Sequence, residues 1–181
     1  MSTQDVVKLR TMTGAGMLDC KKALDEAGGD LDKAAEILRK KGQAKAAKKS
    51  AERETKEGIV HSYIHANSKV GVLIELLCET DFVARNEAFQ ELAHDLAMQI
   101  AATEPLYLKP EDVPQEVVEK EKSMIKDEMA DESKPADVLD KIIEGKMAKY
   151  YEEICLMNQP FIKDEDRTIA DLINDKIASI G

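Results

Sequence analysis

Tryptophan is absent from this 181-residue sequence, and cysteine and histidine occur only three times each. The cysteines, Cys20, Cys78 and Cys155, are odd in number and far apart, and none belongs to a C-x-x-C pair. This pattern argues against both a disulfide framework and a zinc site. We therefore expect all three thiols to be buried as small apolar side chains.

The few histidines also argue against a metal site. His61 and His65 lie two alternations apart in a segment with the composition of a strand, so they would share one face at a spacing of roughly 13 Å. Side chains so far apart cannot hold a single ion. We expect neither a metal nor any other cofactor.

Long apolar runs are missing too. None approaches the ~20 residues that cross a bilayer, and residues 1–5, MSTQD, lack the apolar core of a signal peptide. The formal net charge of −10 opposes attraction to phosphate backbones. We therefore expect a cytoplasmic protein that binds another protein and contacts neither a membrane nor nucleic acid directly.

Catalytic signatures are equally absent. The sequence has no Gly-rich phosphate loop ending in Lys and Ser or Thr, no G-x-S-x-G and no H-E-x-x-H. We therefore predict that the chain is not an enzyme and acts by binding. Two functions of that kind stay open here: a factor that changes the state of its partner, and a scaffold whose binding is indifferent to that state.

What the sequence does contain begins with three short amphipathic helices in residues 1–43. A turn at residues 13–16 separates the first two, Gly28 and Gly29 end the second, and Asp30 is placed to cap the third before Gly42. The three apolar stripes consist of Val6 and Leu9; Met17, Cys20, Ala23 and Leu24; and Leu31, Ala34, Ala35 and Leu38.

A bundle of this size buries little surface, so we expect it to use exposed apolar residues to bind a partner. Met17 and Leu18, directly after the glycine turn, are the candidates. The alternative is that Met17 fills the small core and only Leu18 is exposed.

Residues 44–57 are predicted to form a basic linker helix. From Arg39 to Lys56 the chain carries eight Lys or Arg and two Glu, with alanines between them, which indicates an exposed helix or connector. The segment lacks aromatic residues for stacking on bases, so a solvated connector is favoured over an arm that binds nucleic acid.

The remaining residues, 58–181, form the predicted core. Segments 59–66 and 70–79 are rich in β-branched and aliphatic side chains on either side of a turn, which predicts a β-hairpin. Helical periodicity follows at 89–100, and a helical hairpin is expected at about 115–157. The predicted fold class is α+β: a three-helix bundle followed by a helix-rich core with a small antiparallel sheet. One face of the second strand is fully apolar and comprises Val72, Ile74, Leu76 and Cys78.

Residues 79–83, ETDFV, follow this strand directly and precede a helix, so they are expected to form a tight corner that displays its side chains. The alternative interpretation is structural. Asp81 would then cap the following helix, and Phe82 would be the hydrophobic plug of the corner.

Two stretches resemble signatures of the elongation factor Ts family. Residues 9–24 read LRTMTGAGMLDCKKAL and residues 75–85 read ELLCETDFVAR, and QPF at 159–161 is also similar to the family's later region. The resemblance covers essentially the whole chain. It implies a ubiquitin-associated-like N-terminal module followed by the family's core domain.

The resemblance also implies a function, that of a guanine-nucleotide exchange factor in translation elongation. The implied partner is elongation factor Tu, in its GDP-bound and nucleotide-free forms. In the family the N-terminal module packs on the G domain of Tu, and Met17 and Leu18 match its contact positions. The Thr-Asp-Phe corner intrudes beside the nucleotide site and disturbs the magnesium ion, a role that passes to Thr80, Asp81, Phe82 and Val83.

The chain is similar to the short members of the family, because it has one hairpin where longer members have two sheet-bearing subdomains. Short members act as dimers, so we expect a dimer with the sheet surface buried between subunits and both Phe82 corners free. Short members also continue into another strand beyond the position of Gly181, so we expect the sheet to be incomplete.

Overall fold

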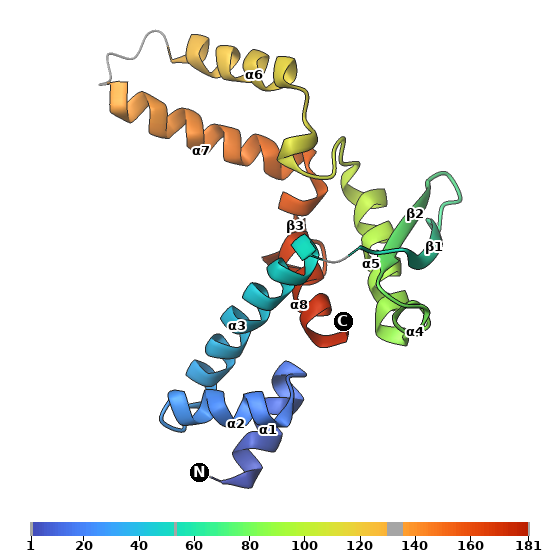
Figure 1. Cartoon of the computed structure of the whole chain (residues 1–181). Coiled ribbons are helices and arrows are strands. Elements are labelled where there is room, and N and C mark those ends of the chain that lie inside the picture. Colours follow the sequence, from blue (N-terminus) through green and yellow to red (C-terminus); the bar gives the residue numbers. More distant parts are fainter. Residues whose placement is uncertain (1, 53, 130–135, 181) are drawn as a thin grey trace. The chain divides into compact units, whose positions relative to one another are not determined.

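The computed structural model describes residues 2–52, 54–129 and 136–180 (Figure 1). This part of the chain is mainly helical with two small antiparallel sheets, which confirms the predicted α+β class. The α-helices are α1 Thr3–Thr13, α2 Met17–Glu26, α3 Leu31–Glu52, α4 Asp81–Ala84, α5 Glu87–Thr103, α6 Gln115–Glu128, α7 Ala136–Ile154 and α8 Ile169–Ile180. The strands are β1 Glu57–Ile64, β2 Gly71–Cys78, β3 Pro160–Phe161 and β4 Asp164–Thr168.

The chain divides into two compact units. The first unit comprises residues 1–62, 73–95 and 171–181, and the second comprises residues 63–72 and 96–170.

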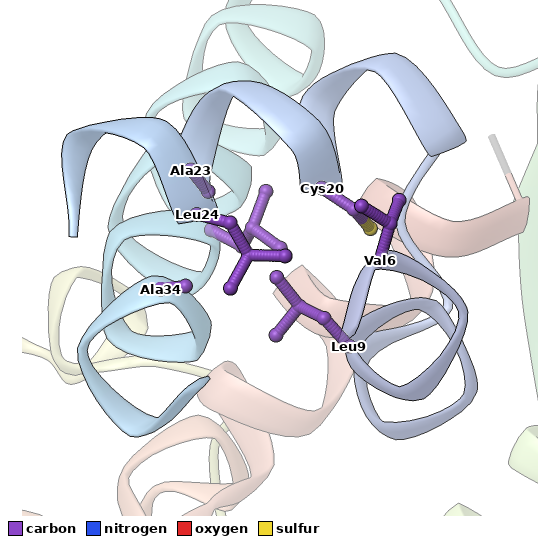
Figure 2. Close-up of a cluster of buried hydrophobic side chains, with 7 residues drawn as sticks. Val6, Leu9, Cys20, Ala23, Leu24 and Ala34 are labelled. Carbon is purple, nitrogen blue, oxygen red and sulfur yellow. The ribbon is translucent and has the colours of Figure 1, made fainter. Parts of the chain in front are cut away.

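The three predicted N-terminal helices are present in the first unit. Helix α1 begins with a capping box, in which the Gln4 N–H donates to Ser2 Oγ and the Ser2 N–H donates to Asp5 Oδ2. It ends at Gly14, whose φ of 68° is the left-handed conformation that favours glycine. Leu9 and Leu24 are fully buried and point toward one another between the helices (Figure 2). The buried cluster consists of Val6, Leu9, Cys20, Ala23, Leu24, Ala34 and Leu38.

The third helix is capped as predicted but extends further than its apolar stripe. Asp30 Oδ1 accepts hydrogen bonds from the Asp32 and Lys33 N–H groups, and the bond from Lys33 is the main cause that lowers the pKa of this carboxyl. Helix α3 then continues through Gly42 to Glu52, because the alanines and lysines of this segment are strong helix formers. The side chains of residues 43–53 lie outside the described part, so a solvated connector there stays a prediction.

Strands β1 and β2 form the predicted hairpin, and the His65 N–H donates to the Val70 carbonyl across its turn. Side chains alternate between more and less exposed along β2, and its last residue, Cys78, is buried. A Cβ at Gly58 would lie 2.3 Å from the Leu76 carbonyl oxygen, so only glycine fits where the two strands begin to pair. Cys78 packs with Ala84 and Phe89 in a small cluster, the corner cluster.

All three cysteines are buried free thiols, as predicted. Burial is also the main cause that raises the pKa of the Cys155 thiol. The Cys155 thiol therefore has little reactive thiolate. All three cysteines are buried and serve as small apolar packing groups.

The predicted helical hairpin lies in the second unit. Helices α6 and α7 run side by side in Figure 1, and each contributes to a shared apolar cluster. Its buried members are Ile125, Met129 and Met147. Residues 130–135, between the two helices, lie outside the described residues.

A buried polar network in the second unit was not predicted from the sequence. Gln99, on α5, is fully buried, and its Nε2 donates to Gln159 Oε1 and to the Pro160 carbonyl, both at 3.2 Å. The Ile162 N–H donates back to Gln99 Oε1 at 2.9 Å. One amide side chain therefore satisfies three groups around the short β3–β4 hairpin.

Gln159 completes this network and is also almost fully buried. Its Oε1 accepts from Thr103 Oγ1 at 2.7 Å, and its Nε2 donates to the Glu153 carbonyl at 3.1 Å. Its own carbonyl accepts from the Ile169 N–H at the start of α8. The two glutamines thus join α5, the end of α7 and β3 by hydrogen bonds.

Gln99→Leu tests the contribution of the network to stability. The substitution removes the partner of the Pro160 carbonyl and of the Ile162 N–H, so we expect the free energy of unfolding to fall by about 1–3 kcal/mol. Urea denaturation measures this change. Gln90→Leu, at an exposed position of the same helix, is the matched control and should be nearly neutral. Equal stability of both variants would mean that the network contributes nothing.

Candidate functional site

The corner after β2 is built from local hydrogen bonds. Thr80 has extended backbone angles and caps the one-turn helix α4, where its Oγ1 accepts from the Val83 N–H. Cys78 Sγ donates to the Thr80 carbonyl at 3.2 Å, which holds the strand end against the cap. The alternative in which Asp81 caps the following helix is therefore wrong, because the residue before it already performs this role.

Phe82 is the most exposed large apolar side chain among the described residues, with 81% of its surface accessible. The interpretation of Phe82 as a hydrophobic plug is therefore wrong. Ala84 and Phe89 fill the space beneath the corner instead, and Val83 packs partly against them. In a single helical turn these neighbours face the cluster, which leaves Phe82 on the outer side.

Asp81 forms a surface ion pair with Arg85, with its Oδ2 3.1 Å from the guanidinium. The exposed fractions of the two side chains are 47% and 78%. A solvated pair of this kind contributes at most about 1 kcal/mol. The carboxylate can therefore change partners at small cost when another group approaches the corner.

The second candidate surface lies at the start of α2. Gly16 precedes this helix, and Met17 and Leu18 are its first two residues, with 41% and 65% of their surfaces exposed. The alternative in which Met17 fills the core is therefore wrong. Cys20, Ala23 and Leu24 fill the core from this helix, which leaves the pair at its N-terminus on the surface.

The histidines are arranged in a way that the sequence did not predict. His61 lies beside His94 of α5, with 3.3 Å between Nε2 and Nδ1, whereas His65 Nδ1 lies 3.1 Å from the Tyr63 hydroxyl. Within the described ranges, no set of three or more His, Cys, Asp or Glu side chains converges as metal ligands would. None of the described helices has the length and apolar character of a membrane span.

Comparison with known proteins shows which family this chain matches. The family model described as Elongation factor TS matches residues 31–181. Elongation factor Ts of Moorella thermoacetica is 56% identical over 181 residues, which cover 100% of this chain and 89% of that protein. The protein of the same name from Thermosipho melanesiensis is 57% identical over 181 residues, covering 100% and 92%. That of Thermotoga maritima is 56% identical over 176 residues, covering 97% and 87%.

Identity at this level, sustained along almost the full length of each pair, is far beyond what a shared fold alone produces. The matched region includes the stretch that forms the exposed corner and the stretch that begins α2. The chain therefore belongs to the elongation factor Ts family.

Proposed function

We propose that this chain is a guanine-nucleotide exchange factor that binds elongation factor Tu and promotes release of GDP, without catalysing a covalent reaction. Family membership supports the choice of partner. The single observation that carries the mechanism is Phe82, a large apolar side chain displayed on a corner whose two ends are fixed. Exposing a large apolar side chain to water is unfavourable in free energy, and burying it against a partner removes that cost.

The proposed mechanism uses the partner's magnesium ion. Mg²⁺ bridges phosphate oxygens and requires near-ideal octahedral geometry, so displacing the groups that hold its water ligands weakens GDP binding without competition for the base. Fully burying Phe82 in the partner would supply about 1.5–3 kcal/mol. That energy corresponds to roughly a ten- to hundredfold change in affinity for the nucleotide.

The other corner residues have separate roles in this proposal. Asp81 exchanges its ion pair with Arg85 for contacts near the shell of the ion, where a carboxylate repels phosphate or accepts hydrogen bonds from water. Thr80 and Val83 hold Phe82 in position, by capping and by packing respectively. The corner acts as a preformed wedge, so little binding energy is lost in ordering it.

Release of the factor follows from reciprocity. If the factor lowers the affinity of Tu for GDP, bound nucleotide lowers the affinity of Tu for the factor by the same ratio. The factor therefore binds the nucleotide-free form more tightly than the GDP-bound form, and incoming GTP displaces it. A scaffold would instead bind all nucleotide states equally. Because Tu acts in translation, we place this chain in the cytoplasm.

Phe82→Ala should slow the stimulated release of a fluorescent GDP from purified Tu, toward the rate without factor, because the wedge is lost. The fold should be unchanged by circular dichroism, since the side chain is exposed. Leu106→Ala removes a similarly exposed side chain outside the corner and is the matched control. If wild-type protein gives no acceleration, the exchange function is wrong. If Phe82→Ala accelerates release as well as wild type, only the wedge is wrong.

We further propose that residues 1–43 form a docking module for the partner, that 44–57 connect it to the core and that 58–181 form the core. Leu18→Ser should weaken binding to Tu by about tenfold, because an exposed apolar contact is lost. Val7→Ser, at another exposed apolar position of the same module, is the control. Calorimetry that gives one affinity for Leu18→Ser and wild type would reject docking through α2.

We propose, finally, that the chain is a dimer. The outer face of the β1–β2 hairpin carries four exposed apolar side chains, Val60, Ile64, Leu73 and Leu77. Pairing of two such faces about a two-fold axis would cover them in both copies. Light scattering should give about twice the 20.1 kDa of one chain, and Leu73→Asp should reduce it to one chain. A wild-type mass near 20.1 kDa would contradict the dimer.

A further inference from the structure

Two of the three histidines lie side by side in the first unit, and nothing in the proposed exchange function uses them. His61 is on β1 and His94 is in the first half of α5. Nε2 of His61 and Nδ1 of His94 are 3.3 Å apart. The ring planes are nearly perpendicular, at 84°, with centroids 5.4 Å apart.

The separation of the two nitrogens is informative. Without an ion, the two rings can share a long hydrogen bond in which the tautomers decide which nitrogen donates. A tetrahedral zinc ion binds imidazole nitrogen at about 2.0–2.1 Å, which places two such nitrogens roughly 3.3–3.4 Å apart. The observed distance therefore matches the spacing of two ligands on one ion.

The two histidines are held by packed elements. Helix α5 buries Phe89, Leu92 and Ala93 close to His94, and Ile59 of β1 packs against the corner cluster that contains Phe89. Little conformational freedom of the backbone would be lost on binding an ion, which favours affinity.

The pair is also accessible. His94 is exposed and His61 is half-buried, so an ion from solvent can reach both nitrogens and keep water in its remaining positions. Imidazole nitrogen suits Zn²⁺, Ni²⁺ and Cu²⁺, whereas Mg²⁺ and Ca²⁺ prefer oxygen.

We propose that His61 and His94 form a binding site for a divalent transition-metal ion of the Zn²⁺, Ni²⁺ and Cu²⁺ class. Nε2 of His61 and Nδ1 of His94 donate their lone pairs, the other ring nitrogens keep their protons, and water completes the coordination. The sequence offered no reason to expect this site, because it placed His61 only relative to His65, at a spacing too large for one ion. The site is independent of the proposed exchange function.

Such an ion would link β1 to α5, the strand and helix that pack against each other in the corner cluster. Binding to the folded state alone stabilises that state in proportion to the logarithm of ion concentration. The corner that carries Phe82 lies between β2 and α5 in the chain. An ion that holds α5 against β1 would therefore also hold the corner more firmly in place.

The test uses full-length protein without a polyhistidine tag, titrated with ZnCl₂ and separately with NiCl₂ by calorimetry at 25 °C. We expect one ion per chain. His61→Gln and His94→Gln should each weaken binding by at least about tenfold, because each removes a direct ligand. His65→Gln removes the remaining histidine of the chain and should leave affinity unchanged. Nuclear magnetic resonance should show Zn²⁺-dependent shifts at the rings of His61 and His94.

Three outcomes would overturn the site. These are no binding of either ion by the wild type, equal binding by wild type and the His61→Gln, His94→Gln double variant, or a loss of binding in His65→Gln as large as in the other two. Circular dichroism of each variant without metal checks that the fold is retained, and the ring shifts of the wild type assign the ligands even where a variant fails to fold.

Discussion

The corner cluster of Cys78, Ala84 and Phe89 is the contact on which the candidate site depends. Cys78 fixes the end of β2, Ala84 fixes the end of α4, and Phe89 fixes the first part of α5, so the chain must turn sharply within a few residues. The space beneath the turn is already filled. Phe82 therefore stays on the surface, which makes it available to a partner.

Elsewhere the fold relies on paired polar groups as well as on apolar packing. Gln99 and Gln159 lie in the interior of the second unit, where unpaired amides would be costly, and each is satisfied by groups that belong to different elements. Such a network favours one arrangement of those elements over alternatives with similar apolar burial. Packing positions the candidate surface of the first unit, and hydrogen bonds position the short hairpin of the second.

The helices, the first hairpin and the burial of Cys20, Cys78 and Cys155 could be predicted because each depends on local periodicity or composition. Strand β4 could not, because Asp164–Thr168 is polar throughout and pairs only through tertiary support. The corner that displays Phe82 was predicted from its position after β2, although the sequence alone left a buried plug open as the alternative. The contact of His61 with His94 escaped prediction, since the two residues are neighbours only in the folded chain. The family resemblance, carried by two short stretches, was confirmed along the whole chain.

The central claim is that the corner weakens nucleotide binding through the partner's magnesium ion, rather than by covering or blocking GDP. Release of fluorescent GDP from Tu, with and without this chain, measured over a range of free Mg²⁺ concentrations, tests that claim most directly. The account predicts that the ratio of stimulated to spontaneous rates falls toward one as Mg²⁺ is removed, because the ion that the corner would disturb is already gone. A ratio that stays constant across the titration would contradict it.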